Sequence, residues 1–183
     1  MCARTAEALT TEHALLGLLR EQPRHGYALY QVLTEPDGLW AIWRMKQSQL
    51  YALLSKLEDR GYLQATTEPQ EGRPPRKVYA LTQQGDAAFD QWLCEPVARG
   101  RQFRMDFMAK LYFARREGPA VVRALIERQR KACHAWVEHL TAGSGDQAEA
   151  LFPRLVRSYR IGQIRAMLDW LNECEEEVLS DAS

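Results

Sequence analysis

The chain has 183 residues, and its 24 basic and 24 acidic side chains give a formal net charge of zero at pH 7. With 46% hydrophobic and 26% charged residues, the composition is that of a globular protein. No uninterrupted apolar run is long enough for a membrane span, and the opening residues lack the basic and apolar regions of a secretion signal. We therefore expect a cytoplasmic protein.

The four cysteines, Cys2, Cys94, Cys133 and Cys174, are far apart in the sequence. They form no CxxC pair, which argues against a structural zinc site and against a thioredoxin-like site. The histidines also lack the spacing of metal ligands. We expect reduced thiols, no metal and no other cofactor.

Two helices are predicted near the start of the chain. Thr10 to His13 fits a cap for the first helix, which Pro23 ends. Gly26 opens the second helix. The apolar connector Leu39 to Trp43 that follows fits either a strand or a loop.

The third predicted helix, Lys46 to Arg60, has the clearest pattern. Its leucines recur at i, i+3, i+4 and i+7 and form one apolar stripe that would face a core. Gly61 is suited to end this helix. The stripe consists of Leu50, Leu53, Leu54 and Leu57.

A β-hairpin is predicted directly after the third helix. Strands at 62–67 and 77–81 flank a turn at 70–76, and Thr82 then caps a fourth helix. Helix, helix, helix, hairpin, helix is the order of a winged helix-turn-helix. We predict a mainly α protein with a two-stranded β wing in its N-terminal domain.

The composition shifts between Pro96 and Gly100, which predicts a domain boundary. The N-terminal domain would cover residues 1–96 and bind DNA, and the second would cover 97–183. The second domain is predicted to be all-helical and to form a dimer. Its helices are predicted at 103–116, 118–140 and 148–178, with a loop at 142–146.

The third helix presents a polar face opposite its leucine stripe. In helix-turn-helix proteins the N-terminal part of this helix usually contacts bases, and Gln can bond to adenine through two atoms. Gln47, Ser48 and Gln49 are therefore predicted base contacts. Hydroxyl and ammonium groups suit phosphates, so we assign Tyr51, Ser55 and Lys56 to the DNA backbone.

The predicted wing adds basic residues to the same region. The segment from Arg44 to Lys77 has seven cations and four anions, a local excess of three positive charges. Arg73, Arg76 and Lys77 lie around the proline-rich tip and suit phosphate or minor-groove contact. The alternative is that both features are only a solvated polar surface.

Several segments resemble the PadR family of transcriptional regulators. The resemblance covers nearly all of the N-terminal half and, more weakly, the start of the helical tail, where it points to the longer PadR subfamily. The segments are HGY at 25–27, LYALLxxLExxGY at 50–62, GRPPRKVY at 72–79, LTxxG at 81–85 and MDFMAKL at 105–111.

The resemblance implies a homodimer that usually represses its target promoters, with repression relieved by small, often aromatic molecules such as phenolic acids. Some members of the family activate instead. Tyr27, within the HGY motif, joins the predicted DNA contacts, and His25 would lie near phosphate at the start of the second helix.

Apolar residues recur at three- and four-residue steps along the last two helices, which favours packing between chains. A two-fold dimer would bind an inverted repeat, because its recognition helices would lie about 34 Å apart. The alternative is an intramolecular bundle. The predicted dimer contacts are Val122, Leu125, Trp136, Ile164, Leu168 and Leu171.

Tryptophans could stack on a flat aromatic effector, although core packing is their commoner role. The expected pocket lies between the two domains. The candidate effector contacts are Trp40, Trp43, Trp92 and Trp136.

Two other classes of function remain. An enzyme is disfavoured, because the sequence has no GxSxG, HExxH, Walker A or GxGxxG motif. A winged helix can also serve as a protein-docking module without DNA binding. The basic residues of the predicted wing argue against that reading.

Overall fold

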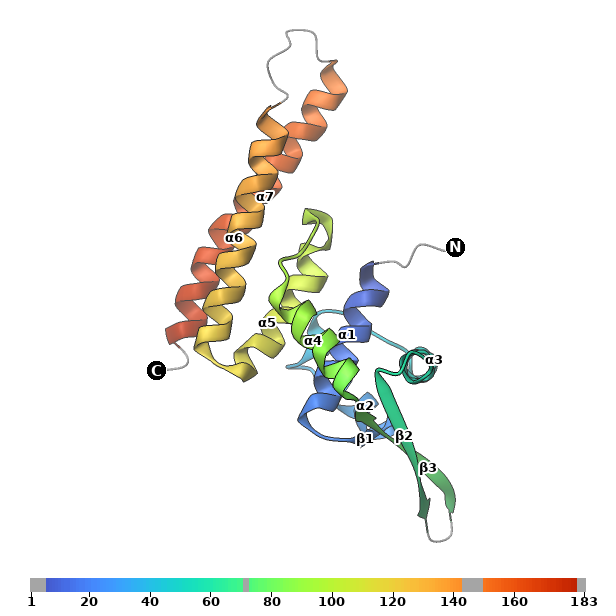
Figure 1. The fold of residues 1–183 in the computed structure, drawn as a ribbon. Coiled ribbons are helices and arrows are strands. Elements are labelled where there is room, and N and C mark those ends of the chain that lie inside the picture. The colour runs from blue at the N-terminus through green and yellow to red at the C-terminus, as the bar shows by residue number, and fades with distance from the viewer. Residues whose placement is uncertain (1–5, 71–72, 143–149, 181–183) are drawn as a thin grey trace.

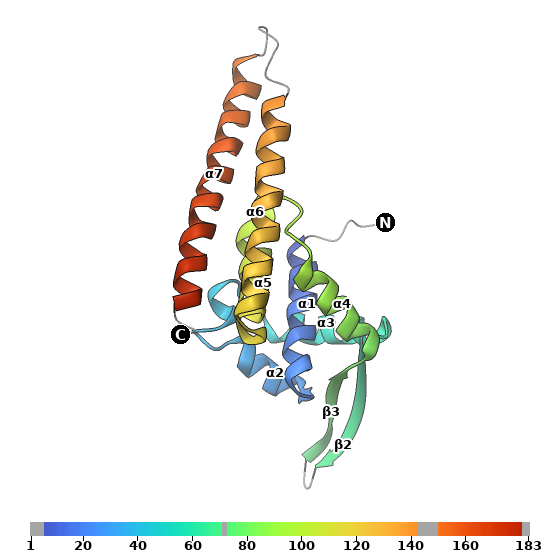
Figure 2. The same ribbon diagram turned by 60° about the vertical axis from the view of Figure 1, so that its left-hand side comes forward.

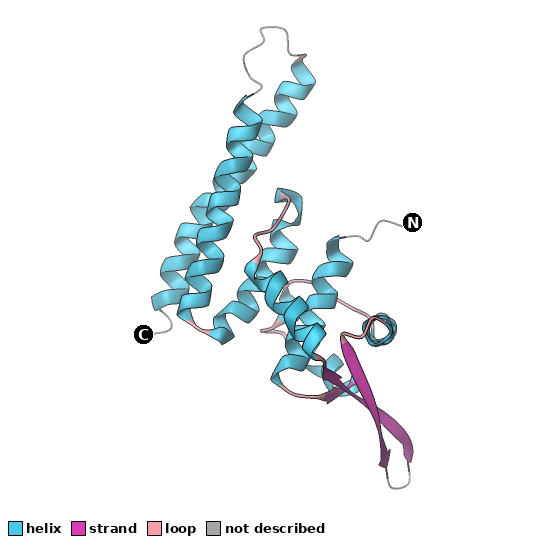
Figure 3. Ribbon diagram, viewed as in Figure 1, coloured by secondary structure: helices cyan, strands magenta, loops and turns pink. Residues whose placement is uncertain are grey.

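The computed structural model describes residues 6–70, 73–142 and 150–180 (Figure 1). Helices dominate it, and its strands form one small sheet (Figure 3). The elements in chain order are α1 (Ala6–Glu21), β1 (Arg24–His25), α2 (Gly26–Leu33), η1 (Leu39–Ala41), α3 (Gln47–Asp59), β2 (Leu63–Gln70), β3 (Arg73–Leu81), α4 (Gln83–Cys94), η2 (Gly100–Gln102), α5 (Phe103–Glu117), α6 (Pro119–Ala142) and α7 (Leu151–Ser180).

The predicted fold class is confirmed, with one strand added. The sheet is antiparallel in the order β1-β3-β2, so the two residues of β1 extend the predicted hairpin to three strands. Leu63 pairs with Leu81, and Thr66 pairs with Val78. The hairpin β2-β3 projects from the N-terminal half as the wing (Figure 2).

The leucine stripe of α3 lies in the core, as predicted. Leu50, Leu54 and Leu57 are fully buried, and Leu53 packs against the core from a partly buried position. Each fully buried leucine contributes about 1.5–3 kcal/mol through the hydrophobic effect. Gly61 ends the helix with a φ of 75°, which L residues with a side chain rarely adopt.

The predicted cap of the first helix at Thr10 to His13 is wrong, because α1 begins at Ala6. The sequence Ala-Glu-Ala-Leu at 6–9 consists of strong helix formers, so the helix extends toward the N-terminus. The hydroxyl of Thr10 instead donates a hydrogen bond to Asp106 Oδ1 on α5, at 3.0 Å.

The predicted turn at 70–76 is too long, because β3 already begins at Arg73. Arg76 pairs with Glu68, and a register shift lies between Glu68 and Gln70. Prolines 74 and 75 lack N–H groups, and β1 pairs with β3 only at Val78 and Tyr79, so this part of β3 has one partner strand. The connector after α2, left open between strand and loop, forms the 3-10 helix η1.

The three predicted C-terminal helices correspond to α5, α6 and α7. Helices α6 and α7 run antiparallel as a long arm beside the N-terminal half (Figure 1). The rings of Phe103 and Phe107 stack at 4.8 Å, and Trp170 of α7 meets both edge-on at 5.9 Å. None of the described helices is long and apolar enough to cross a membrane.

Two buried polar side chains hold the segment between α4 and α5, where the domain boundary is predicted. Lys110 is 2% exposed, and its Nζ donates to the carbonyl oxygens of Trp92 at 2.7 Å and Glu95 at 2.6 Å. Burial lowers the pKa of Lys110, and nearby Asp106 partly opposes this. Gln129 of α6 accepts a hydrogen bond from the N–H of Val97 at 2.7 Å. The boundary at residue 96 stays a prediction.

Candidate nucleic-acid interface

The exposed face of α3 carries the predicted base contacts. Gln47, Ser48 and Gln49 are all exposed in the first turn. The side-chain oxygen of Gln49 accepts a hydrogen bond from the N–H of Lys46 at 2.9 Å, as part of a capping box. Gln49 therefore stabilises the start of α3, whereas a two-atom contact with adenine would need that same oxygen.

The HGY motif lies at the start of α2 and packs against α3. His25 Nδ1 accepts a hydrogen bond from the N–H of Ala28 at 3.1 Å and so caps α2. Gly26 is buried, and the ring of Tyr51 occupies the space where a side chain at position 26 would lie. Tyr27 and Tyr51 remain 54% and 42% exposed. The motif thus presents two tyrosine side chains beside the polar face of α3.

Lys56 is partly engaged in holding α3 on α1. Its Nζ lies 2.7 Å from Glu12 Oε1, and Arg60 Nη1 lies 3.2 Å from Glu12 Oε2. Glu12 is only 3% exposed. Its carboxylate compensates two of the cations that create the local charge excess. No local sequence pattern indicates this role of Glu12, because it lies 44 residues before Lys56.

The basic side chains described on β3 have acidic neighbours. Arg76 donates to Glu68 Oε2 through Nε at 3.1 Å and Nη2 at 3.0 Å, and Lys77 Nζ lies 3.3 Å from Glu58. Exposed pairs of this kind contribute about 0–1 kcal/mol, so exchange for a phosphate oxygen costs little. The predicted contact through the side chain of Arg73 lies outside what the structure describes.

Two exposed cations that are not among the predicted DNA contacts precede α3. Arg44 lies over the ring of Trp40, with 5.7 Å between the guanidinium carbon and the ring centroid. Lys46 is the N-cap residue of α3. Neither forms an ion pair in the described part of the chain. In the sequence, only the position of Arg44 and Lys46 just before α3 indicates that they could contact DNA.

The structure does not gather the four candidate tryptophans into one pocket. Trp43 and Trp92 are core residues. The Nε1 of Trp92 donates to Asp106 at 2.9 Å, and its ring stacks on His13 at 5.3 Å. Trp40 is half-buried next to Arg44. Trp136, also half-buried, lines a pocket between η2 and the arm.

Most of the predicted dimer contacts are already covered within the single chain. Val122, Leu125, Ile164 and Leu171 are buried, whereas Trp136 and Leu168 are half-buried. A second chain would therefore not reach the buried four directly. The large exposed apolar side chains described in the C-terminal half lie instead on the first turns of α7, at Leu151, Phe152, Leu155 and Tyr159.

No group of three or more His, Cys, Asp or Glu side chains among the described residues is arranged to hold a metal ion. The exposed side chains at the start of α3 are amides and hydroxyls, and Arg44 and Lys46 lie just before it. These groups suit contact with the phosphates and base edges of DNA.

Family models match both halves of the chain. Residues 15–91 match the transcriptional regulator PadR-like family, and residues 103–178 match the virulence activator alpha C-terminal model. The first match contains α2, α3 and the wing, and the second contains α5, α6 and most of α7.

Individual relatives are matched over shorter stretches. The chain is 36% identical over 92 residues to the probable transcriptional regulator Rv1176c of Mycobacterium tuberculosis, covering 50% of this chain and 48% of that protein. It is 33% identical over 102 residues to the negative transcriptional regulator PadR of Bacillus subtilis, covering 56% and 55%. The chain thus spans about half the length of these curated relatives.

Among solved structures, Bacillus subtilis PadR in complex with operator DNA matches 92% of this chain and 97% of its own, at 24% identity and a TM-score of 0.46. The matching family consists of transcriptional regulators and not of enzymes. The chain belongs to the PadR-like family of transcriptional regulators, with a C-terminal half of the virulence activator alpha type.

Proposed function

We propose that this regulator binds double-stranded DNA through α3 and the wing. The observation that carries the proposal is the two-sided character of α3, whose leucines are buried while Gln47, Ser48 and Tyr51 are exposed. The wing projects from the same half of the molecule, on the side away from α6 and α7 (Figures 1 and 2). Helix-turn-helix proteins place such a helix in the major groove.

The contacts divide into two groups. Gln47, Ser48 and Gln49 contact base edges at the start of α3. Positively charged and hydroxyl groups contact phosphates, where they set affinity and orientation but not sequence preference. These are Tyr27, Tyr51, Ser55, Lys56, Arg73, Arg76 and Lys77, to which the structure adds Arg44 and Lys46 as exposed cations.

We further propose that the protein acts as a homodimer on an inverted repeat. The support is α7, which packs along α6 on one side and exposes Phe152, Leu155 and Tyr159 on another. Exposed apolar residues clustered in this way commonly mark a protein interface. A two-fold axis would place the recognition helices one DNA turn apart, about 34 Å.

We propose that the protein is a cytoplasmic repressor relieved by a small aromatic effector. The relative from Bacillus subtilis is named a negative regulator, which supports repression over activation. Activation, and protein docking without DNA binding, are the outcomes that would contradict this proposal.

The test is a titration of fluorescent duplexes from the regulator's own promoter region, followed by anisotropy at several salt concentrations. We expect selective binding to an inverted repeat and a steep linear fall of log affinity with log salt, because each phosphate contact releases counterions. The controls are a scrambled duplex and the variant Arg165→Gln, an exposed arginine on α7 far along the chain from α3.

Failure to bind any duplex at low salt would contradict DNA binding and favour docking. Binding to both duplexes with equal affinity would contradict sequence specificity. In a reporter strain carrying the promoter, deletion of the regulator should raise expression, and a fall in expression would contradict repression.

A further inference from the structure

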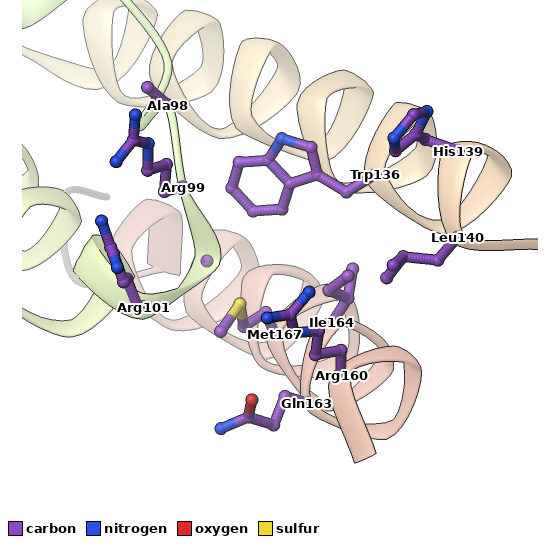
Figure 4. A pocket seen from close by; sticks show the side chains of 11 residues that line it. Ala98, Arg99, Arg101, Trp136, His139, Leu140, Arg160, Gln163, Ile164 and Met167 are labelled. Carbon is purple, nitrogen blue, oxygen red and sulfur yellow. The ribbon is translucent and has the colours of Figure 1, made fainter. Parts of the chain in front are cut away.

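A pocket of about 530 Å³ lies between the segment around η2 and the arm formed by α6 and α7 (Figure 4). This volume falls in the range of small-molecule sites, about 300–1,000 Å³. One wall comes from residues 98–101, between the DNA-binding half and α5. The other wall comes from α6 and α7.

The pocket carries three arginines and no carboxylate. Arg99 and Arg101 come from the segment around η2, and Arg160 comes from α7. Their side chains border one space in Figure 4. In the described part of the chain none of the three forms an ion pair, whereas Arg20, Arg76 and Arg130 elsewhere do.

The remaining lining is largely apolar. The indole of Trp136 extends across the pocket from α6, and Ile164 and Met167 face it from α7 (Figure 4). Gly100 comes close to both helices, since a Cβ there would lie 3.8 Å from Met167 Cε and from Trp136 Cζ3. The pocket therefore offers a flat apolar surface with cations at its rim.

The position of the arginine-bearing wall is fixed by the fold. Val97 is buried, and its N–H is bound by the fully buried Gln129 of α6. Arg99 follows two residues later and Arg101 four residues later. The backbone that carries Arg99 and Arg101 is thus held to α6, on the other side of the pocket from Arg160, so a single anionic group near one wall would leave the other wall without a counter-charge.

We propose that this pocket binds an amphipathic ligand with two anionic groups on an aromatic body, of the class of aromatic dicarboxylates. The aromatic part packs on Trp136, Ile164 and Met167, one anion binds Arg99 and Arg101, and the second binds Arg160. Guanidinium groups bind carboxylates through charge-assisted hydrogen bonds, often two at a time.

The ligand would also act on the DNA-binding half. It bridges α7 to the segment that follows α4, so it favours one placement of the arm relative to the wing and α3. A ligand shifts an equilibrium only by its different affinity for the two states, and the coupling is reciprocal. This effector role rests on the proposed function, whereas ligand binding itself does not.

Isothermal titration calorimetry with naphthalene-2,6-dicarboxylate as the probe tests the site without DNA. We expect saturable binding, about tenfold weaker for 2-naphthoate and weaker again for the uncharged naphthalene-2,6-dimethanol, because each lost ion pair costs about a factor of ten. Equal affinity for the three compounds, or no binding of the probe, would overturn the proposal.

Variants locate the binding in the pocket. Arg160→Gln should weaken binding of the probe about tenfold and bring it close to that of 2-naphthoate. Arg165→Gln, on the same helix but outside the pocket, should bind like the wild type. If both variants lose the same affinity, the effect is general electrostatics and the site is wrong. Trp136→Leu keeps all three arginines but removes the indole, and should therefore bind the probe more weakly than the wild type.

The effector role is tested by DNA affinity at a saturating probe concentration. We expect at least a severalfold change in operator affinity that Arg160→Gln abolishes. An unchanged affinity would overturn the effector role. A protein that binds the probe but no DNA would contradict the proposed function and leave the ligand site standing.

Discussion

The ring of Tyr51 on α3 lies against the backbone of Gly26 at the start of α2, in the space that any larger residue at position 26 would fill. This contact fixes the two helices relative to each other and sets the direction of the Tyr51 side chain. It also explains why a glycine lies between His25, which caps α2, and Tyr27, which is exposed.

We expect Gly26→Ala to lower DNA affinity about tenfold, the effect of losing one good contact of about 1.4 kcal/mol. The added methyl group would push the half-exposed Tyr51 aside, and the core leucines of α3 would not move. The measurement is anisotropy with the operator duplex, with thermal unfolding as the check on folding. Gly162→Ala, where the added Cβ meets nothing within 4 Å, is the matched control. An equal loss in both variants would contradict the role given to Tyr51.

Gln47 and Gln49 should behave differently. Gln47→Ala should relax base preference at one operator position by about 1–3 kcal/mol. Gln49→Ala should in addition reduce stability by about 0.5–1 kcal/mol, because it removes the hydrogen bond that caps α3. Binding to a set of single-base operator variants, together with chemical denaturation, separates the two effects. Identical stability of both variants would contradict the capping role.

The carboxylate of Glu12 should contribute more to the free energy of unfolding than other acidic groups of the N-terminal half. Glu12→Gln leaves Lys56 and Arg60 without a counter-charge at a nearly buried position, and we expect the free energy of unfolding to fall by about 1–3 kcal/mol. Glu68→Gln removes an exposed partner of Arg76, and its expected cost is about 0–1 kcal/mol. Denaturant titration measures both, and equal costs would show that burial of Glu12 has no energetic role.

The cysteines should differ strongly in reactivity. In a Cys2→Ser background, an aromatic disulfide reagent should modify Cys94 rapidly, because that thiol is exposed. Cys133 and Cys174 are buried, and burial raises the pKa of both thiols, that of Cys174 to about 11. Two of the three thiols should therefore react only as the protein unfolds. Adding Cys94→Ser should remove the fast phase, and a fast phase that persists would contradict the burial of the other two.

The same pKa shift predicts a stability change at alkaline pH. The thiol of Cys174 keeps its proton in the folded state up to about pH 11, whereas its ordinary value is 9.0. The unfolded state therefore binds fewer protons between these two values, and stability falls as the pH rises through that window. Cys174→Ala should lose less stability than the wild type between pH 9 and 11. Parallel denaturation curves for the two proteins would contradict the shift.

The parts of the fold that could be predicted from the sequence depend on local patterns. The leucine stripe of α3, the Thr82 cap and the order of the helices follow from residue spacing within one turn or a few turns. The hydroxyl of Thr82 does accept a hydrogen bond from the N–H of Gly85 at 3.1 Å, as the capping pattern predicts. These features need no knowledge of distant partners.

The parts that could not be predicted depend on contacts between distant segments. The hydrogen bond of Thr10 could not be predicted, because its partner Asp106 is 96 residues away. The ion pair between Lys56 and Glu12 joins two helices that are far apart in the sequence, so no local pattern indicates it, and the DNA contact of Lys56 stays a prediction. An apolar stripe such as that of Val122 and Leu125 does not reveal whether the surface that covers it belongs to the same chain. In this structure the same chain buries both residues.

The bonds of Lys110 have a mechanical consequence. They tie α5 to the C-terminal end of α4, so α5 moves with the DNA-binding half. Helix α5 ends at Gly118, whose φ of 114° suits glycine and where an added Cβ would meet nothing within 4 Å. Helix α6 starts there and is about 36 Å long. Gln129, about 15 Å along α6, binds the N–H of Val97, so the arm cannot turn about Gly118 without breaking that hydrogen bond, and a displacement of α6 would be passed directly to the segment that follows α4.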